Sequence, residues 1–386
     1  MRILMITETL MTGGAEWFVL RLSDAFIGAG HEVQLFILRP DLIDERMTSQ
    51  FKAVPIFHAP VKLIKNAVRA DRVLQKLFGF QPAVESINKH YLSNVMETFK
   101  PDVLHSHLLP ADFTTIHANQ AFSKRHIITI HGDHIQYIKK GNSKKIEISR
   151  RVLQTVDGIV LISDEQKRIL SEALPTIASK CKKIYNGYPL PENKEPLHKH
   201  GNFTFGMIAR GIPEKGWEQA IQAFTRIKNQ EARLLFFGES DYLNDLKSKQ
   251  TDSRITFAGF TNNPLQAINQ IDVGLLPTYY PSESLPTTVI EYLALQKPVI
   301  ATRAGEIAQM MEDESGHIAG VIISEHTPET ITEPLFQAMK HLMEETELYH
   351  KCSEYAVQAA LKFSMEMCLS KYLSIYQSDA KNEKEE

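Results

Sequence analysis

The sequence predicts an α/β protein built from two doubly wound domains, each a parallel sheet covered by helices on both faces. Three observations carry this prediction. Short apolar runs alternate with amphipathic segments in the first half, the alternation restarts in the second half, and residues 188–201, rich in proline and charge, separate the halves. Continuous apolar strands between helices are typical of a buried parallel sheet. Such sheets bind ligands beyond the carboxyl ends of their strands, so two facing sheets would form a cleft for two substrates.

The apolar runs place the elements in chain order. Strands of the first half are predicted at 2–7, 33–38, 102–106, 126–131, 158–163 and 182–185, with a helix at 15–29. Strands of the second half are predicted at 203–209, 233–238, 254–258, 272–276, 298–302 and 320–323. Helical periodicity predicts helices at 216–228, 241–249, 264–270, 286–296, 304–312, 328–345, 347–362 and 365–377. The predicted domains are 1–188 and 189–364, followed by a flexible tail at 378–386.

Composition limits the class of protein. The 386 residues are 43% hydrophobic and 23% charged with a net charge of −3, which is ordinary for a soluble two-domain protein and gives no general attraction to nucleic acid. The three cysteines are far apart and predict neither a disulfide framework nor a zinc site. No apolar run reaches the roughly 20 residues that span a membrane, and the N-terminal run is too short for a signal peptide. We therefore expect a cytoplasmic protein.

Two glutamates in the second half form the most informative motif. Glu283 and Glu291 are separated by seven residues, the first in a predicted loop and the second in the helix that follows. Ser284 is predicted to cap this helix and Pro286 to lie in its first turn. The carboxylates would then lie about 10 Å apart, the span from sugar to ribose in a nucleotide-diphosphate sugar, with a phosphate-binding helix start between them. The alternative is that both acids only favour a helix start.

Two cations follow the first strand of the second half. Arg210 and Lys215 lie on the loop after the predicted strand 203–209, where a parallel sheet presents ligands. An arginine fork and a lysine point charge suit a diphosphate. The alternative is a solvated loop with ordinary surface charges.

The first strand of the chain leads into a glycine pair, Gly13 and Gly14, at a helix start that can hold an anion. This is not the dinucleotide fingerprint, and the second strand ends in Arg39 rather than in the acid that would hold an NAD ribose. The alternative is a glycine pair that only packs. An oxidoreductase is therefore the least favoured class.

Histidines follow two strands of the first half. His131 ends the predicted strand 126–131 beside Gly132, where it can reach a cleft and contact a transferred sugar. With 15 histidines in the chain, a structural role is the alternative. His105 and His107 share one face of a strand, but no third ligand has a fixed place near them, so no metal site is predicted.

A basic stripe is predicted on a helix within 61–80. Its cations have spacings of three and four residues, which place them on one side of a helix whose other side is apolar. Such a helix can lie on an anionic membrane or bind an anionic acceptor. The alternative is a solvated face, and no aromatic platform supports nucleic-acid binding. The stripe comprises Lys62, Lys65, Arg69, Arg72 and Lys76.

In order and spacing these motifs resemble the large retaining glycosyltransferase family 4, also described as glycosyl transferases group 1, which has the GT-B fold. The matches span nearly the whole chain, and they are weak singly but specific together. They are Gly13-Gly14-Ala15-Glu16, Pro101-Asp102-Val103-Leu104-His105-Ser106-His107, Thr129-Ile130-His131-Gly132, Ile162-Ser163, Asn186-Gly187, Arg210 with Lys215, Gly259, and Glu283 with Glu291.

The resemblance implies a role for each site residue. Glu283 would hydrogen-bond hydroxyls of the donor sugar, and Glu291 would bind the ribose. Arg210 and Lys215 would neutralise the diphosphate, and the helix 365–377 would pack back on the first domain. The implied catalytic residues are His131, Glu283, Arg210 and Lys215, and the implied donor-binding residues are Gly14, Arg210, Lys215, Glu283, Leu285, Pro286, Thr287 and Glu291.

One departure from the family pattern concerns the donor sugar. Many members read Glu-Gly-Phe-Gly where this chain has residues 283–286, Glu-Ser-Leu-Pro. Pro286 has no N–H to donate, and the side chains at 284 and 285 narrow the sugar pocket. The resemblance therefore leaves the choice of sugar open.

The implied function is metal-independent, retaining transfer of a hexose or N-acetylhexosamine to a glycan or lipid-linked acceptor. The donor is a nucleotide-diphosphate sugar, with a UDP-sugar favoured over a GDP-sugar, and no cofactor is implied. The product would be a cell-surface polysaccharide such as lipopolysaccharide, capsule, O-antigen or a teichoic-type polymer, made on the inner face of the cytoplasmic membrane. Two alternatives stay open: a GT-B nucleotide-sugar epimerase, and a non-catalytic nucleotide-sugar binding protein.

Overall fold

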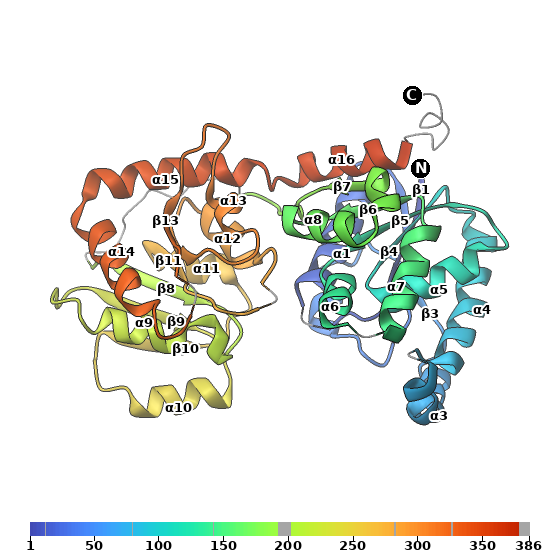
Figure 1. The fold of residues 1–386 in the computed structure, drawn as a ribbon, viewed down its shortest axis with the longest axis horizontal. Coiled ribbons are helices and arrows are strands. Elements are labelled where there is room, and N and C mark those ends of the chain that lie inside the picture. Colours follow the sequence, from blue (N-terminus) through green and yellow to red (C-terminus); the bar gives the residue numbers. More distant parts are fainter. Residues whose placement is uncertain are drawn as a thin grey trace. The chain divides into compact units, whose positions relative to one another are not determined.

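The computed structural model describes residues 1–11, 13–78, 80–141, 143–191, 202–281, 283–325 and 327–377. The chain divides into two compact units, one formed by Met1–Tyr188 with the segment that begins at Met365, the other by Pro189–Ser364 (Figure 1). Most of the predicted linker and the whole predicted tail, 378–386, lie outside the described residues.

The first unit is a parallel sheet of seven strands in the order β3-β2-β1-β4-β5-β6-β7. Alternate residues of β1 enter two different cores, because Ile3 and Met5 pack on one face of the sheet and Leu4 and Ile6 on the other. Both faces are therefore covered. The strands are β1 Arg2–Thr7, β2 Glu32–Ile37, β3 Ile56–His58, β4 Val103–His107, β5 Arg125–Ile130, β6 Gly158–Leu161 and β7 Cys181–Lys183. The helices are α1 Gly14–Gly28, α2 Glu45–Thr48, α3 Val61–Phe78, α4 Pro82–Phe99, α5 Leu109–Asn119, α6 Asp133–Lys140, α7 Ser143–Thr155, α8 Asp164–Ala173, the 3-10 turn η1 Pro175–Lys180 and α16 Met365–Gln377.

The last helix, α16, packs on the first unit, where it contacts α1. The Tyr372 hydroxyl lies 2.8 Å from Oγ1 of Thr129, and the Tyr376 hydroxyl lies 2.6 Å from Nδ1 of His105. Tyr376 also stacks on Phe26 of α1, with ring centroids 5.5 Å apart. Two buried hydroxyls thus connect the end of the chain to β4 and β5.

The second unit is a parallel sheet of six strands in the order β10-β9-β8-β11-β12-β13. Its core contains a fully buried Trp217 packed edge-on against Phe236, with ring centroids 5.1 Å apart. The strands are β8 Thr204–Ile208, β9 Arg233–Phe237, β10 Ile255–Gly259, β11 Val273–Leu276, β12 Val299–Thr302 and β13 Gly320–Ile323. The helical elements are η2 Pro213–Lys215, α9 Trp217–Phe224, α10 Asp241–Lys249, α11 Pro264–Ile268, α12 Thr287–Ala294, α13 Ile307–Met311, α14 Thr332–Glu344 and α15 Thr346–Leu361.

Each sheet has one point where the strand order reverses. In the first unit it lies between β1 and β4, and in the second between β8 and β11. Ligands of doubly wound sheets bind beyond the strand ends at such points. The loops that follow β1, β4 and β5, and those that follow β8, β11 and β12, are therefore where functional residues are expected. None of the described helices is both long and apolar enough to cross a membrane.

Candidate functional site

Three loops of the second unit meet beyond the ends of β8, β11 and β12, and they enclose an ion pair. Nζ of Lys215, at the end of η2, lies 2.5 Å from Oε2 of Glu283, in the loop after β11. Both side chains are only 8% exposed. The structure therefore brings together two of the predicted site residues that are far apart in sequence.

Thr278 holds the carboxylate of this pair in place. Its Oγ1 lies 3.1 Å from Oε2 of Glu283 and 3.1 Å from the carbonyl oxygen of Glu214. The Thr302 hydroxyl at the end of β12 donates in turn to the Thr278 carbonyl, at 2.5 Å. The loop after β11 is thus connected to η2 on one side and to β12 on the other.

Two glycines allow these loops to approach one another. Gly216 has φ +84°, and a Cβ on it would lie 2.2 Å from the Pro277 carbonyl oxygen. Gly305 has φ +53°, and a Cβ on it would lie 2.3 Å from the Glu283 carbonyl oxygen. Side chains are excluded at both positions, by backbone conformation and by space. The predicted helix 304–312 is shorter than expected because this turn delays its start to Ile307.

Tyr280 brings the two predicted cations together. Its ring centroid lies 5.1 Å from Cζ of Arg210 and 5.3 Å from Nζ of Lys215, both within the range of cation–π attraction. The Arg210 side chain is exposed and forms no ion pair within the described part of the chain. One cation is thus compensated by Glu283, while the other faces solvent. Thr278, Tyr280 and Gly305 were not predicted as site residues, because the only signal they carry in the sequence is their place after strand ends.

The helix that carries Glu291 starts without a side-chain cap. The prediction that Ser284 caps it is wrong, because α12 begins at Thr287 and the preceding residue, Pro286, has no side-chain acceptor. The Ser284 carbonyl instead accepts the Glu306 N–H, at 2.9 Å. Glu291 lies in the second turn and is 6% exposed. The N-cap residue Pro286 offers no side-chain acceptor to the first N–H groups of α12, which are the kind of group that binds an anion at a helix start.

Tyr292 attaches α12 to the strand-order reversal. Its hydroxyl accepts the Ile208 N–H at 3.0 Å, where β8 ends. The residue is fully buried. Glu291 therefore lies on a helix held against the same strand end that leads to Arg210 and Lys215.

In the first unit, His131 pairs with His107. His131 directly follows β5 and His107 ends β4, and their Nε2 and Nδ1 atoms lie 3.0 Å apart. Burial lowers the pKa of His131 to about 4, and burial followed by the neighbouring His105 and His131 holds the pKa of His107 well below its ordinary value. Both rings are neutral at pH 7, so one must donate to the other. His107 therefore forms a neutral hydrogen-bonded pair with His131.

Across the described residues, no group of three or more His, Cys, Asp or Glu side chains is arranged to hold a metal ion. His105 and His107 do share a strand face, with ring centroids 4.2 Å apart. Their other contacts are hydrogen bonds: Nε2 of His105 lies 2.8 Å from Oγ1 of Thr129.

The glycine turn of the first unit lies at the start of α1. Gly13 is the N-cap and Gly14, exposed, is the first helical residue. The Glu16 carboxylate folds back over this turn, so a Cβ on Gly13 would lie 2.3 Å from its Oε2. Thr9 donates to Oε1 of Glu16 at 3.1 Å. The helix start is therefore faced by a carboxylate of the chain itself.

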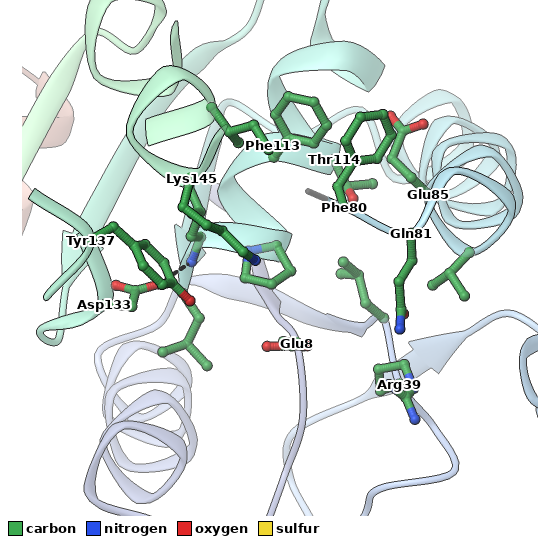
Figure 2. A pocket seen from close by; sticks show the side chains of 16 residues that line it. Glu8, Arg39, Phe80, Gln81, Glu85, Phe113, Thr114, Asp133, Tyr137 and Lys145 are labelled. Atoms are coloured by element: carbon green, nitrogen blue, oxygen red, sulfur yellow. Dashed lines mark hydrogen bonds between the residues drawn. The ribbon is translucent and has the colours of Figure 1, made fainter. Parts of the chain in front are cut away.

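A pocket of about 330 Å³ lies at the strand-order reversal of the first unit (Figure 2). Its polar lining comes from the residues that follow β1 and β2, from α6 and α7, and from α5 and the start of α4. Its apolar lining comes mainly from the segment between α3 and α4 and from α5. Two of its central polar residues, Glu8 and Asp133, were not predicted as site residues from the sequence.

The predicted basic stripe lies on α3. Lys62, Lys65, Arg69 and Arg72 are exposed, whereas the side chain of Lys76 lies outside the described part of the structure. The helix also exposes large apolar side chains. These are Val61, Leu63, Leu74 and Phe78.

Comparison with known proteins agrees with this architecture. The family described as Glycosyltransferase Family 4 matches residues 12–191, and the family described as Glycosyl transferases group 1 matches residues 191–359. An uncharacterized glycosyltransferase of Methanocaldococcus jannaschii is 26% identical over 289 residues, covering 74% of this chain and 77% of that protein. The putative teichuronic acid biosynthesis glycosyltransferase TuaC of Bacillus subtilis is 22% identical over 290 residues, covering 66% and 72%.

Among solved structures, HepE of Anabaena in complex with UDP matches with a TM-score of 0.77 at 16% identity, covering 97% of this chain and 99% of that chain. This likeness shows the fold. The chain belongs to the family 4, group 1 glycosyltransferases of GT-B fold, and it is related to enzymes that make cell-surface polysaccharides.

Proposed function

We propose that this protein transfers a hexose or N-acetylhexosamine, with retention of configuration, from a nucleotide-diphosphate sugar to a glycan or lipid-linked acceptor of a cell-surface polysaccharide. The observation that carries the proposal is the cluster of Arg210, Lys215 and Glu283 at the strand-order reversal of the second unit. A buried acid held by a buried lysine, beside an exposed arginine, provides both charges that a sugar diphosphate needs.

The diphosphate would bind between the cations and the start of α12. Arg210 and Lys215 share the Tyr280 ring, and the N–H groups of Thr287 and Thr288 begin an uncapped helix. Lys215 is neutralised by Glu283. An incoming diphosphate would share the ammonium, which frees the carboxylate to accept hydrogen bonds from sugar hydroxyls.

The remaining donor contacts follow from position. Glu291, in the second turn of α12, would accept hydrogen bonds from the ribose hydroxyls. Leu285 and Pro286, two and three residues after Glu283, would limit the size of the sugar. The base is proposed to be uracil, and Gly14 would present its backbone N–H at the reaction centre.

Bond breaking would depend on charge stabilisation. As the anomeric C–O bond breaks, the electron pair moves to the diphosphate oxygen, where Arg210, Lys215 and the α12 start stabilise it by preorganised electrostatics. These groups would do the work of a divalent ion. The acceptor hydroxyl attacks on the same face and gives its proton to the departing phosphate oxygen. His131, neutral and held by His107, would contact the transferred sugar.

The acceptor would bind to the first unit, with α3 against an anionic membrane surface on the cytoplasmic side. Exposed cations and exposed apolar side chains occur together on this helix. Attraction of a basic residue to an anionic surface is worth about 1 kcal/mol. Flotation with anionic liposomes should therefore fall by tenfold or more when Lys65, Arg69 and Arg72 are replaced by glutamine. Equal flotation of the wild type and the glutamine variant would contradict the proposal that α3 binds a membrane.

Calorimetric titration with UDP and GDP tests the donor site. Lys215→Ala and Glu291→Ala should each weaken binding of UDP at least tenfold, because a charged hydrogen bond contributes about 1.5–3 kcal/mol. Lys249→Ala is the matched control, since Lys249 is an exposed lysine of the same unit paired with Asp245. Unchanged affinity in both site variants would contradict the donor site.

The reaction class needs a second measurement. Proton NMR of the product formed from a UDP-sugar and an acceptor glycoside should show the anomeric configuration of the donor. Nucleotide release without any acceptor would instead favour an epimerase. Donor binding without release in the presence of every acceptor would favour a binding protein.

A further inference from the structure

The pocket of the first unit collects side chains from four strand ends. Glu8 follows β1, Arg39 follows β2, Leu109 begins the helix after β4, and Asp133 follows β5. Figure 2 shows Glu8 between Arg39 on one side and Asp133 on the other. All the residues that line this pocket belong to the first unit, and none of them is among the residues proposed to bind the nucleotide.

The charges around the pocket do not balance. Arg39 is held by both carboxylate oxygens of Asp41, each at 2.9 Å, so its charge is compensated outside the pocket. Burial is the main cause that raises the pKa of Glu8, and the nearby Asp133 raises it further. Arg39 and Lys145 act in the opposite direction. Glu85 also lines the pocket, but its Oε1 lies 2.6 Å from Nδ1 of His117. The acids Glu8 and Asp133 share the lining with one further cation, Lys145.

Asp133 carries a buried oxygen that lacks a partner. Its Oδ2 accepts the Leu109 N–H, whereas its Oδ1 is buried and has no hydrogen-bond partner. A buried acceptor without a donor costs free energy, which a ligand with a hydroxyl can remove. An anionic ligand group brings no such donor and would be repelled by both acids.

The other walls of the pocket are aromatic. Phe80 and Phe113 lie with ring centroids 5.1 Å apart, and the Tyr137 ring lies 5.2 Å from Nζ of Lys145. A few acceptor oxygens set in a mainly apolar cavity give a small molecule both orientation and affinity. A pyranose ring, with apolar C–H faces and hydroxyls at its edge, matches this arrangement.

We infer that this pocket binds a neutral pyranose, the terminal sugar of the acceptor, with its hydroxyls donated to Glu8 and Asp133 and its ring against Phe80 and Phe113. The inference rests on the proposed transferase function and specifies its acceptor. It also narrows the expectation of an anionic acceptor, because phosphate or carboxylate groups of the acceptor must lie outside this pocket. The exposed cations of α3, which ends just before Phe80, are placed to receive them.

Saturation-transfer NMR on the full chain with saturating UDP tests the inference. The neutral probes are the methyl α- and β-glycosides of glucose, galactose, mannose and N-acetylglucosamine, and the anionic probes are methyl glucuronoside and glucose 1-phosphate. We expect binding of at least one neutral probe and of neither anionic probe. Glu8→Gln and Asp133→Asn should each weaken the neutral probe about tenfold or more. Glu165→Gln, an exposed acid of the same unit, should leave it unchanged.

The outcomes separate this inference from the donor site. If the chain binds UDP but none of the neutral probes, the inference is overturned and the transferase proposal still stands. The same holds if a neutral probe binds equally to the wild type and to both pocket variants. Stronger binding of an anionic probe would also overturn it. Loss of UDP binding in the wild-type chain would contradict the proposed function itself. Phe113→Ala, which removes one wall, should abolish probe binding while UDP binding persists. Because Phe113 is buried in the first unit and UDP is proposed to bind the second, the fold of the first unit is checked by urea denaturation followed by Trp17 fluorescence in a Trp217→Phe background.

Discussion

Replacement of Lys215 by methionine should destabilise the second unit by about 3 kcal/mol, because it leaves the Glu283 carboxylate buried without its cation. Removal of one partner of a buried ion pair typically costs about 3–5 kcal/mol. The lower end of this free-energy range applies to Lys215→Met. Thr278 still offers a hydroxyl 3.1 Å from the carboxylate, and the Glu283 side chain is 8% exposed to solvent. Glu283→Gln alone should cost less, because the amide oxygen can still accept from Lys215.

The double variant measures the interaction itself. With both Lys215→Met and Glu283→Gln, no charge is left unpaired, so the loss should be about 1 kcal/mol and the coupling free energy about 2 kcal/mol or more. The chain has two tryptophans, and only Trp217 belongs to the second unit. In a Trp17→Phe background, urea denaturation followed by tryptophan fluorescence therefore reports on the second unit alone.

A destabilisation below 1 kcal/mol in Lys215→Met would refute this reasoning. So would additivity of the two single changes within about 0.5 kcal/mol, the scatter expected of independent sites. Lys249→Met serves as the control, since its ion pair is exposed and should contribute about 0.3–0.5 kcal/mol. The stability measurement needs no ligand and is therefore independent of the proposed donor.

Three further perturbations test other parts of the structure. Stability of the first unit should fall below pH about 6.5, because only the unfolded chain takes up the protons of its buried histidines with lowered pKa values, and each contributes about 1.4 kcal/mol per pH unit. These histidines are His105, His107, His126 and His131. Asp112, with its pKa raised to about 6, and His134, with a raised pKa, hold their protons more tightly when folded and oppose part of this fall. Tyr376→Phe should destabilise the first unit by about 1–3 kcal/mol, because Nδ1 of His105 loses its buried partner. Gly305→Ala should displace the Glu283 loop and weaken UDP binding, because the added Cβ would lie 2.3 Å from a carbonyl oxygen.

Each of these predictions has a control. Urea midpoints of a Trp217→Phe variant, measured between pH 5.5 and 8 by Trp17 fluorescence, should rise with pH, and a flat profile would contradict the histidine assignment. Tyr91→Phe, on α4, is the control for Tyr376→Phe, and equal effects would show that the hydroxyl of Tyr376 has no special role. Gly259 has φ +80° but open space around a Cβ, so Gly259→Ala separates backbone strain from the clash at Gly305.

Local patterns were sufficient to predict most of the sheet. Buried parallel strands such as Val299–Thr302 are continuous apolar runs, which is why their positions were predicted to within a residue or two. The edge strand Ile56–His58 was not predicted, because three partly exposed residues are too few to show a hydrophobic periodicity. The Ser284 cap was predicted wrongly, because a serine near a helix start is a good cap only when the backbone is not already engaged elsewhere. Here the chain turns at Gly305 and binds the Ser284 carbonyl.

The candidate site was likewise predictable from the sequence only in part. Arg210, Lys215 and Glu283 each follow a strand, and chemistry alone made each a candidate. Their contact depends on β8 and β11 being neighbours, a pairing that no local pattern contains. The acid-rich pocket has the same origin, since Glu8 and Asp133 meet only when β1, β4 and β5 lie in order.

The residues thus predicted the fold class, the strand-end positions and the family, because hydrophobic period and motif spacing are properties of the chain itself. The tertiary structure alone decided that Lys215 is neutralised by Glu283, that His107 holds His131, and that the pocket of the first unit carries excess acid. Each of these depends on burial and on which strands pair, and both are set by the packing of segments distant in sequence.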